Sequence, residues 1–193
     1  MRLLCAEAGI PMSKVRAGKL AASDWAAFVD AAAHLHDAPM FIVDAGNITI
    51  LDIRAKARRL KSREGLSLIV VDYLQLMSHH RRVENRQQEI AEISRSLKLL
   101  AKELDVPIMA LSQLNRDPER GNSRPQLANL RESGALEQDA DVVMFIHRER
   151  GPDGHWASDT AELMIAKHRN GPTGTVELHF KEDLMQFRSL YRA

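Results

Sequence analysis

Cysteine is almost absent from this sequence, since Cys5 is the only one among 193 residues. A single cysteine excludes an internal disulfide framework and a cysteine-rich zinc site, and it favours a reducing compartment. We expect Cys5 to be a small buried apolar residue.

Long apolar runs are absent too. The opening MRLLCAEAGI has too short an apolar run, and too early an acid in Glu7, for a secretory signal, and no later window approaches transmembrane length. These absences predict a cytoplasmic protein with no membrane partner. The same opening has no capping residue in front and ends at Gly9, which is typical of the end of a helix. The chain is therefore expected to begin inside a larger fold.

Neither sign of charge dominates, because 27 Lys and Arg residues stand against 26 Asp and Glu residues. A nucleic-acid site must then lie in a local cluster of basic residues. The content of 45% hydrophobic and 27% charged residues is that of an ordinary soluble globular protein.

Apolar strands alternate with amphipathic helices along most of the chain. Ser23 is the expected N-cap of the first long helix, with Trp25 and Phe28 in the core. The patterns predict helices over residues 23–39, 49–65 and 84–105, and strands over residues 40–44, 66–72, 106–113 and 140–147. This order indicates βαβ units and a mostly parallel sheet sandwiched by helices. Residues 161–180 contain two strand-like runs around a turn, which predicts an antiparallel hairpin at the end of a single α/β domain, residues 1–193.

The stretch LSLIVVDYLQLM, residues 66–77, is an apolar run that stops at Asp72. We expect a central strand covered on both faces. In an open parallel sheet the ligand site lies beyond the carboxyl ends of the strands. A carboxylate there can hold a divalent cation beside the phosphates of a nucleotide. The alternative is structural, because an acid that caps the next loop ends many buried strands.

Polar side chains also end two other expected strands. Ser112 and Gln113 follow an apolar run, and an amide at such a place can bind a γ-phosphate or its attacking water. Lys167 and Arg169 are two residues apart, so an extended strand projects both to one side, with His168 opposite. Two such cations suit phosphate oxygens, and on an outer hairpin they can reach a neighbouring subunit's nucleotide. A solvated basic turn is the alternative for the pair.

Two arginine-containing loops are candidates for nucleic-acid binding. The second, residues 115–134, has about twenty residues without clear secondary structure, which is uncommon in a compact domain unless the loop is functional or disordered. Arginines with almost no aromatic residues between them favour contacts to backbone phosphates over base stacking. A solvated surface loop is the alternative. The arginines are Arg81, Arg82 and Arg86 in the first loop and Arg116, Arg120, Arg124 and Arg131 in the second.

Five ordered blocks resemble the C-terminal motor domain of DnaB-type replicative DNA helicases, within the RecA-like P-loop NTPases. They are LIVVDYLQLM, ENRQQEIAEISRSLKLLAKEL, PIMALSQLNR, LRESGALEQDADVVMFIHRE and IAKHRNGPTGTVELHF. The resemblance runs from the first residue to near the last. It implies a RecA-like α/β core and an ATP-hydrolysing enzyme that moves 5′ to 3′ on DNA.

The resemblance also implies roles for single residues. Asp72 becomes the acid that holds Mg²⁺ beside ATP, Gln113 senses the γ-phosphate, and Lys167 and Arg169 act in trans. Both arginine-containing loops would line the channel of a homohexamer, where they meet single-stranded DNA. Primase and a helicase loader are further candidate partners. The DNA-binding residues would be Arg81, Arg82, Arg116, Arg120, Arg124, Arg131, Glu132 and Gly134.

One motif of that family is missing from the sequence. A P-loop needs G-x-x-x-x-G-K-[ST], but after Gly18 and Lys19 comes Leu20, and Ser13 stands at the position of the first glycine. We expect Gly18 and Lys19 to form a turn. The resemblance implies a domain without its first strand, its P-loop and the general base, which would be inactive alone. The alternatives are a non-catalytic DNA-binding or ring-interacting remnant and another RecA-like ATPase.

Overall fold

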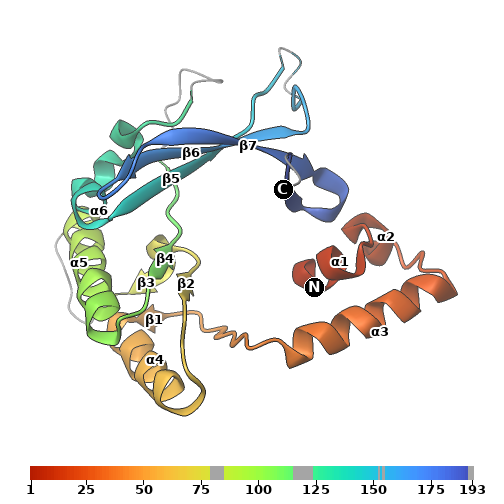
Figure 1. The fold of residues 1–193 in the computed structure, drawn as a ribbon, viewed down its shortest axis with the longest axis horizontal. Coiled ribbons are helices and arrows are strands. Elements are labelled where there is room, and N and C mark those ends of the chain that lie inside the picture. The colour runs from red at the N-terminus through yellow and green to blue at the C-terminus, as the bar shows by residue number, and fades with distance from the viewer. Residues whose placement is uncertain (79–84, 115–123, 152, 154, 191–193) are drawn as a thin grey trace. The chain divides into compact units, whose positions relative to one another are not determined.

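The computed structural model describes residues 1–78, 85–114, 124–151, 153 and 155–190 (Figure 1). These residues fold into two compact units. Unit 1 comprises the described residues of 1–43, 146–164 and 174–193, and unit 2 those of 44–145 and 165–173. Within the described ranges, no helix combines the length and the apolar composition needed to cross a bilayer.

Unit 2 contains two pairs of parallel strands, β1 with β3 and β2 with β4. Helices alternate with these strands, as the sequence predicts. The elements are β1 Ile48–Thr49, α4 Ile50–Glu64, β2 Ile69–Val71, the short 3-10 helix η1 Leu74–Leu76, β3 Met77–Ser78, α5 Arg86–Leu104, β4 Ile108–Ala110, the 3-10 helix η2 Leu127–Ser133 and α6 Gly134–Asp139.

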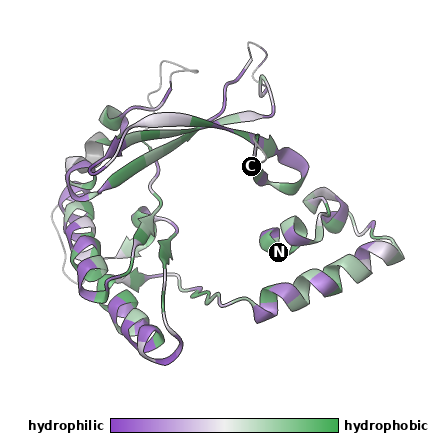
Figure 2. Ribbon diagram, in the orientation of Figure 1, coloured by the Kyte–Doolittle hydropathy of each residue, from purple (hydrophilic) through white to green (hydrophobic). Residues whose placement is uncertain are grey.

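The predicted apolar stripe of α5 is confirmed as the centre of the unit 2 core. Ile93, Leu97 and Leu100 are each at most 5% exposed, and they cluster with Val71 of β2 and Ile53 of α4. Strands β2 and β4 are drawn in hydrophobic green (Figure 2). Because Val71 packs on α5, this helix supports the last residue of β2.

Local capping sets the limits of α4. The Thr49 hydroxyl accepts a hydrogen bond from the Asp52 N–H at 3.3 Å, and the Asp52 carboxylate accepts one from the Thr49 N–H at 3.0 Å. This reciprocal pair satisfies two amides at the start of the helix that have no intrahelical partner. Gly65 ends the helix at φ 81, a left-handed value that favours glycine.

Strand β2 is confirmed as a strand, but the expectation that it is covered on both faces is wrong. Val71 is 7% exposed and packs in the core, whereas its neighbour Val70 is 54% exposed. Val70 pairs in register with Met109 of β4, which is 45% exposed. Successive strand residues point to opposite faces, and α5 covers only one face. The described residues leave the other face exposed.

A four-stranded sheet follows in chain order, and its strands lie in the order β5, β6, β7, β8. Strands β7 and β8 pair antiparallel. The predicted α/β fold with a C-terminal antiparallel sheet is thus confirmed, although β5 is half-buried: Val143 and Phe145 are buried and the alternating residues are exposed. The elements are β5 Val142–His147, β6 Thr160–His168, β7 Gly174–Lys181, the 3-10 helix η3 Glu182–Leu184 and β8 Gln186–Ser189.

In unit 1, the first three helices pack around a small core of Cys5, Ile10 and Phe28. The predicted N-cap Ser23 is wrong. The N-cap of α3 is Ala21, two residues earlier, where the Asp24 carboxylate accepts a hydrogen bond from the Ala21 N–H at 2.7 Å. Trp25 is 60% exposed, so its predicted core position is also wrong. The helices are α1 Arg2–Ala8, which ends at Gly9 as predicted, α2 Met12–Arg16 and α3 Ala22–Asp37.

The strand predicted over residues 40–44 does not form. A strand requires a neighbour that shares its backbone hydrogen bonds, and no described strand pairs with this segment. Met40, Phe41, Ile42 and Val43 are between 45% and 71% exposed. The apolar and β-branched residues that predicted a strand favour an extended backbone. They do not determine whether a neighbouring strand is present to form the backbone hydrogen bonds.

Truncating the unit 2 core should lower the free energy of unfolding. We expect Ile93→Ala to cost about 2–5 kcal/mol, because it leaves a cavity in a packed core. Leu99→Ala on the same helix should change stability by less than about 0.5 kcal/mol, since Leu99 is 60% exposed. Urea unfolding followed by helical circular dichroism measures both. Equal losses for the two variants would contradict this account of the core.

Candidate functional site

The carboxyl ends of β2 and β4 bring two predicted site residues to one edge of unit 2. Val71 and Ala110 pair as the last residues of the two parallel strands. Asp72 follows β2 directly, and Gln113 lies three residues beyond the end of β4. Both residues are exposed. The structure therefore places the acid and the amide where a bound nucleotide is expected in an open parallel sheet.

Gln75 fixes the segment that contains Gln113, a contact that the sequence analysis missed. Its side-chain amide donates to the Ser112 hydroxyl at 3.0 Å and to the Gln113 carbonyl at 3.3 Å. Its amide oxygen accepts from the Gln113 N–H at 3.4 Å. The only sequence signal was a glutamine three residues after the acid, inside a quoted stretch.

Arg86, which the sequence placed in a basic loop, stabilises the same edge. Its guanidinium donates to the Gln75 carbonyl at 2.6 Å and forms an ion pair with Glu89. Arg86 is the first residue of α5. The helix therefore ties the core to the loop that follows β2.

Asp72 is the only carboxylate that was predicted to hold a metal at this edge. Among the residues that the structure describes, no three His, Cys, Asp or Glu side chains gather as a metal site. Mg²⁺ usually keeps several waters and takes one or two carboxylates together with substrate phosphates. An exposed Asp72 fits that kind of coordination, and it does not fit a metal cage built of protein ligands.

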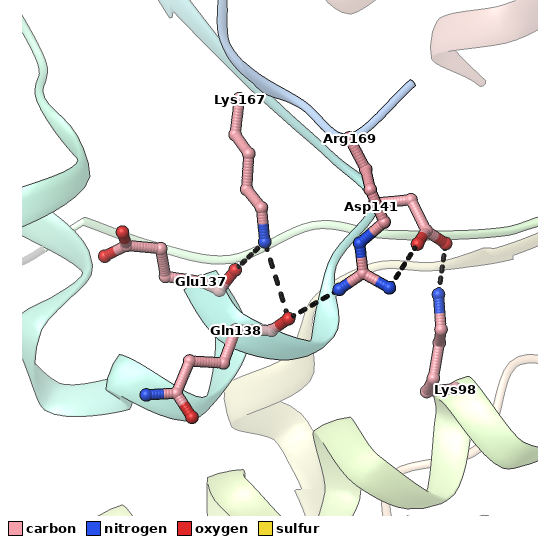
Figure 3. A network of polar contacts seen from close by, with 6 residues as sticks. All are labelled: Lys98, Glu137, Gln138, Asp141, Lys167 and Arg169. Carbon is pink, nitrogen blue, oxygen red and sulfur yellow. Dashed lines mark hydrogen bonds and ion pairs between the residues drawn. The ribbon is translucent and has the colours of Figure 1, made fainter. Parts of the chain in front are cut away.

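Lys167 and Arg169 converge on the carboxyl end of α6 (Figure 3). Lys167 Nζ donates to the Glu137 carbonyl and, at 3.4 Å, to the Gln138 carbonyl. Arg169 Nη2 donates to the same Gln138 carbonyl at 3.2 Å. The last carbonyls of a helix lack intrahelical partners and attract cations. The two cations thus lie on one side, as their spacing predicts, and their catalytic role stays a prediction.

Asp141 adds a carboxylate to these cations. Arg169 Nη1 lies 3.4 Å from its Oδ1, and Lys98 of α5 contacts its Oδ2. The hydrogen bond from Lys98 is the largest effect that holds the pKa of the Asp141 carboxyl below its ordinary value, and the charges of Lys98, Arg169 and Lys167 act in the same direction. Asp141 and Lys98 both lie within the quoted blocks, but no role was predicted for either, because their contact joins residues 43 positions apart.

The second predicted DNA loop is partly helical. Asn129 and Gln126 exchange hydrogen bonds, and this pair starts η2, which continues directly into α6. The expectation of a loop without secondary structure is therefore wrong for residues 127–134. Arg131 and Glu132 lie within η2, Gly134 begins α6, and Arg124 is exposed before them. The predicted residues Arg81, Arg82, Arg116 and Arg120 lie outside the described residues.

Gly134 has no conformational or steric need to be glycine within the described chain. Its φ of −50 and ψ of −25 are helical values that any residue adopts. A Cβ added there would meet no described atom within 4 Å. Glycine in a helix lowers stability by about 1 kcal/mol relative to alanine. The missing side chain of Gly134 leaves open space beside its backbone.

Comparison with known proteins finds relatives along almost the whole chain. A family model described as the DnaB-like helicase C-terminal domain matches residues 1–189. The chain is 51% identical over 193 residues to the replicative DNA helicase DnaB of Leifsonia xyli subsp. xyli, an alignment that covers 98% of this chain and 42% of the relative. It is 49% identical over 199 residues to DnaB of Geobacillus stearothermophilus, covering 100% of this chain and 43% of that protein. The chain thus spans less than half the length of these curated relatives.

Two solved structures are also similar to this chain. One, described as an ATPase domain, superposes with a TM-score of 0.91 at 37% identity, covering 98% of this chain and 69% of that one. A DnaB-like replicative helicase, described with its interactions with primase, gives the same TM-score and identity and covers 98% and 48% of the two chains. The resemblance suggested by the five sequence blocks is confirmed: the chain belongs to the DnaB-like helicase C-terminal domain family.

Proposed function

We propose that this chain is part of the motor domain of an ATP-dependent replicative DNA helicase, which unwinds duplex DNA while it moves on a single strand as a hexameric ring. The observation that supports this most is the placement of Asp72 and Gln113 beyond the ends of two parallel strands that pair in register. Membership of the DnaB-like family supports the same proposal.

Asp72 and Gln113 have different roles in this proposal. ATP with Mg²⁺, when bound, supplies the phosphoanhydride bond whose cleavage drives movement. Asp72 would hold Mg²⁺, and Gln113 would hydrogen-bond the γ-phosphate or the attacking water. Gln75 keeps the Gln113 backbone in place through two hydrogen bonds and binds the neighbouring Ser112 hydroxyl through a third. Lys167 and Arg169 stabilise the developing phosphate charge at the nucleotide of a neighbouring subunit.

The strand-binding surface includes Arg124, Arg131, Glu132 and Gly134 in this proposal. The basic side chains contact phosphates, which have no sequence information, so the motor can move on any strand. Gly134 supports this assignment because its open backbone allows a strand to approach closely. The residues outside the described ranges that we assign to the same surface are Arg81, Arg82, Arg116 and Arg120.

The proposed partners and location follow from the family. We assign single-stranded DNA, other copies of the subunit in a homohexamer, primase and a helicase loader as partners, in the cytoplasm. The similarity to a replicative helicase described with its interactions with primase supports the primase partner.

The 193 residues lack the P-loop that the proposed reaction needs. Gly18 has a φ of 65 and lies in a turn beyond α2, as predicted, and no G-x-x-x-x-G-K-[ST] motif occurs in the sequence. Most of the donors for the phosphates are therefore absent from this polypeptide. We infer that residues 1–193 need a separate P-loop segment for catalysis. A non-catalytic DNA-binding or ring-interacting remnant is the second candidate function.

Residues 1–193 as a purified polypeptide should not hydrolyse ATP. We expect no heat of binding at roughly millimolar ATP with Mg²⁺ and no phosphate release, because the P-loop amides and lysine are missing. Calorimetry and a phosphate-release assay measure both. The complete Geobacillus stearothermophilus relative, assayed in parallel, is the positive control. ATP turnover by the 193-residue polypeptide would contradict this prediction.

Gly134→Ala should separate stability from strand binding. The change should stabilise the chain by up to about 1 kcal/mol, since alanine is the better helix former. It should also weaken binding to a fluorescent oligo-dT, because the methyl group occupies the space left for the strand. Urea unfolding and fluorescence anisotropy measure the two effects. Increased stability with unchanged binding would contradict the assignment of Gly134 to the strand-binding surface.

The arginines should contribute to binding through phosphates. Each contact to a single strand contributes about 0.7 to the slope of log affinity against log salt. We therefore expect Arg124→Ala with Arg131→Ala to weaken oligo-dT binding and to lower the slope by about 1.4. The matched control replaces two exposed arginines of α4, Arg59 and Arg63, by alanine. Equal effects of the two pairs would indicate non-specific charge attraction and not a defined strand site.

A further inference from the structure

Arg169 is held to Asp141 by both its backbone and its side chain. The Arg169 N–H donates to the Asp141 carbonyl at 2.8 Å, and Nη1 lies 3.4 Å from the carboxylate. Gln138 accepts a hydrogen bond from the other terminal nitrogen of the guanidinium. The guanidinium is therefore restrained at two points on one edge (Figure 3). The side chain is still 50% exposed, so donors remain accessible to a ligand.

Lys98 offsets the negative charge beside Arg169. A carboxylate next to this guanidinium would by itself oppose a phosphate, but Lys98 contacts the second oxygen of Asp141. Lys98, Lys167 and Arg169 supply three positive charges around Asp141, and the carboxylates of Glu137 and Asp139 lie on the adjoining end of α6. Because Lys98 offsets the charge of Asp141, the guanidinium of Arg169 can be restrained by that carboxylate and still attract a phosphate.

The core of unit 2 anchors this cluster. The Ser94 hydroxyl donates to the Asp139 carboxylate at 2.8 Å, one turn of α5 before Lys98. Ser94 is 7% exposed, and it is the only polar side chain that is buried among the described residues. Two side chains of α5 thus hold the end of α6 and Asp141, two residues beyond it. Because α5 is packed in the core, the orientation of Arg169 depends on a rigid element.

We propose that Asp141 and Lys98 are positioning residues for Arg169. Asp141 holds the guanidinium in one orientation against the end of α6, and Lys98 neutralises Asp141 so that the cluster accepts the terminal phosphate of a nucleotide. This inference rests on the proposed function, in which Arg169 acts on a neighbouring subunit's nucleotide. The contacts among the three residues can be tested without that function.

The first experiment titrates the Asp141 carboxyl in the 193-residue chain, using carbon-13 NMR of labelled aspartate. We expect its pKa to lie below the ordinary value, because the cations around it stabilise the ionised form. Lys98→Met should raise this pKa, and Arg169→Met should raise it by less. Lys56→Met, at an exposed lysine of α4, should leave it unchanged. No change with Lys98→Met would overturn the proposal.

The second experiment uses a complete helicase in which residues 1–193 replace the matching segment of the Leifsonia xyli relative. Asp141→Asn and Lys98→Met should each lower kcat for ATP by about 10- to 100-fold, the range expected for a misplaced group, with KM unchanged. Asp141→Glu should restore part of kcat, and the exposed control Asp105→Asn should have no effect. The double variant Asp141→Asn with Arg169→Ala should be no slower than Arg169→Ala alone.

The outcomes separate this inference from the proposed function. If Arg169→Ala abolishes turnover while Asp141→Asn keeps full kcat, Arg169 acts as proposed and the positioning role is overturned. If Arg169→Ala keeps full turnover, the proposed role of Arg169 at a neighbouring subunit's nucleotide is contradicted, regardless of the kcat of Asp141→Asn. A lowered kcat for Asp141→Asn that adds to the loss from Arg169→Ala would also overturn the inference, because the two residues would then act independently.

Discussion

The packing of α5 against β2 and α4 is the contact on which both parts of the candidate site depend. The buried stripe of this helix holds Val71, the last residue of β2, and thereby sets the position of Asp72. The first residue of α5, Arg86, binds the carbonyl of Gln75, which in turn fixes the segment of Gln113. Loss of this packing would therefore displace the acid and the amide together.

The same helix supports the cationic part of the site through its polar residues. Ser94 and Lys98 are four residues apart, so they lie on one side of the helix, and they contact Asp139 and Asp141. The Lys98–Asp141 ion pair is partly exposed, and such pairs contribute little to stability. Their effect is on orientation: the helix is held by its apolar stripe, and the short-range polar contacts then direct Arg169.

Sequence periodicity predicted the elements that depend on local information. The stripe of α5 and the helix ends at Gly9 and Gly65 were predicted, because spacing and a left-handed φ are properties of short segments. Three of the failed predictions share one cause. Trp25 is exposed, the segment 40–44 forms no strand, and one face of β2 is uncovered, because each depends on which other segment lies against it. Apolar residues favour burial, but their presence does not show which other segment of the chain packs against them.

By itself the sequence determined the helices, most strands, the family, the candidate site residues that adjoin recognisable patterns, and the absence of a P-loop within these 193 residues. Only the tertiary structure decided that Gln75 meets Gln113, 38 positions away, and that Lys98 meets Asp141, 43 positions away. The physical reason is that such hydrogen bonds require distances near 3 Å. Packing and strand register set those distances, whereas the spacing of the residues along the chain does not.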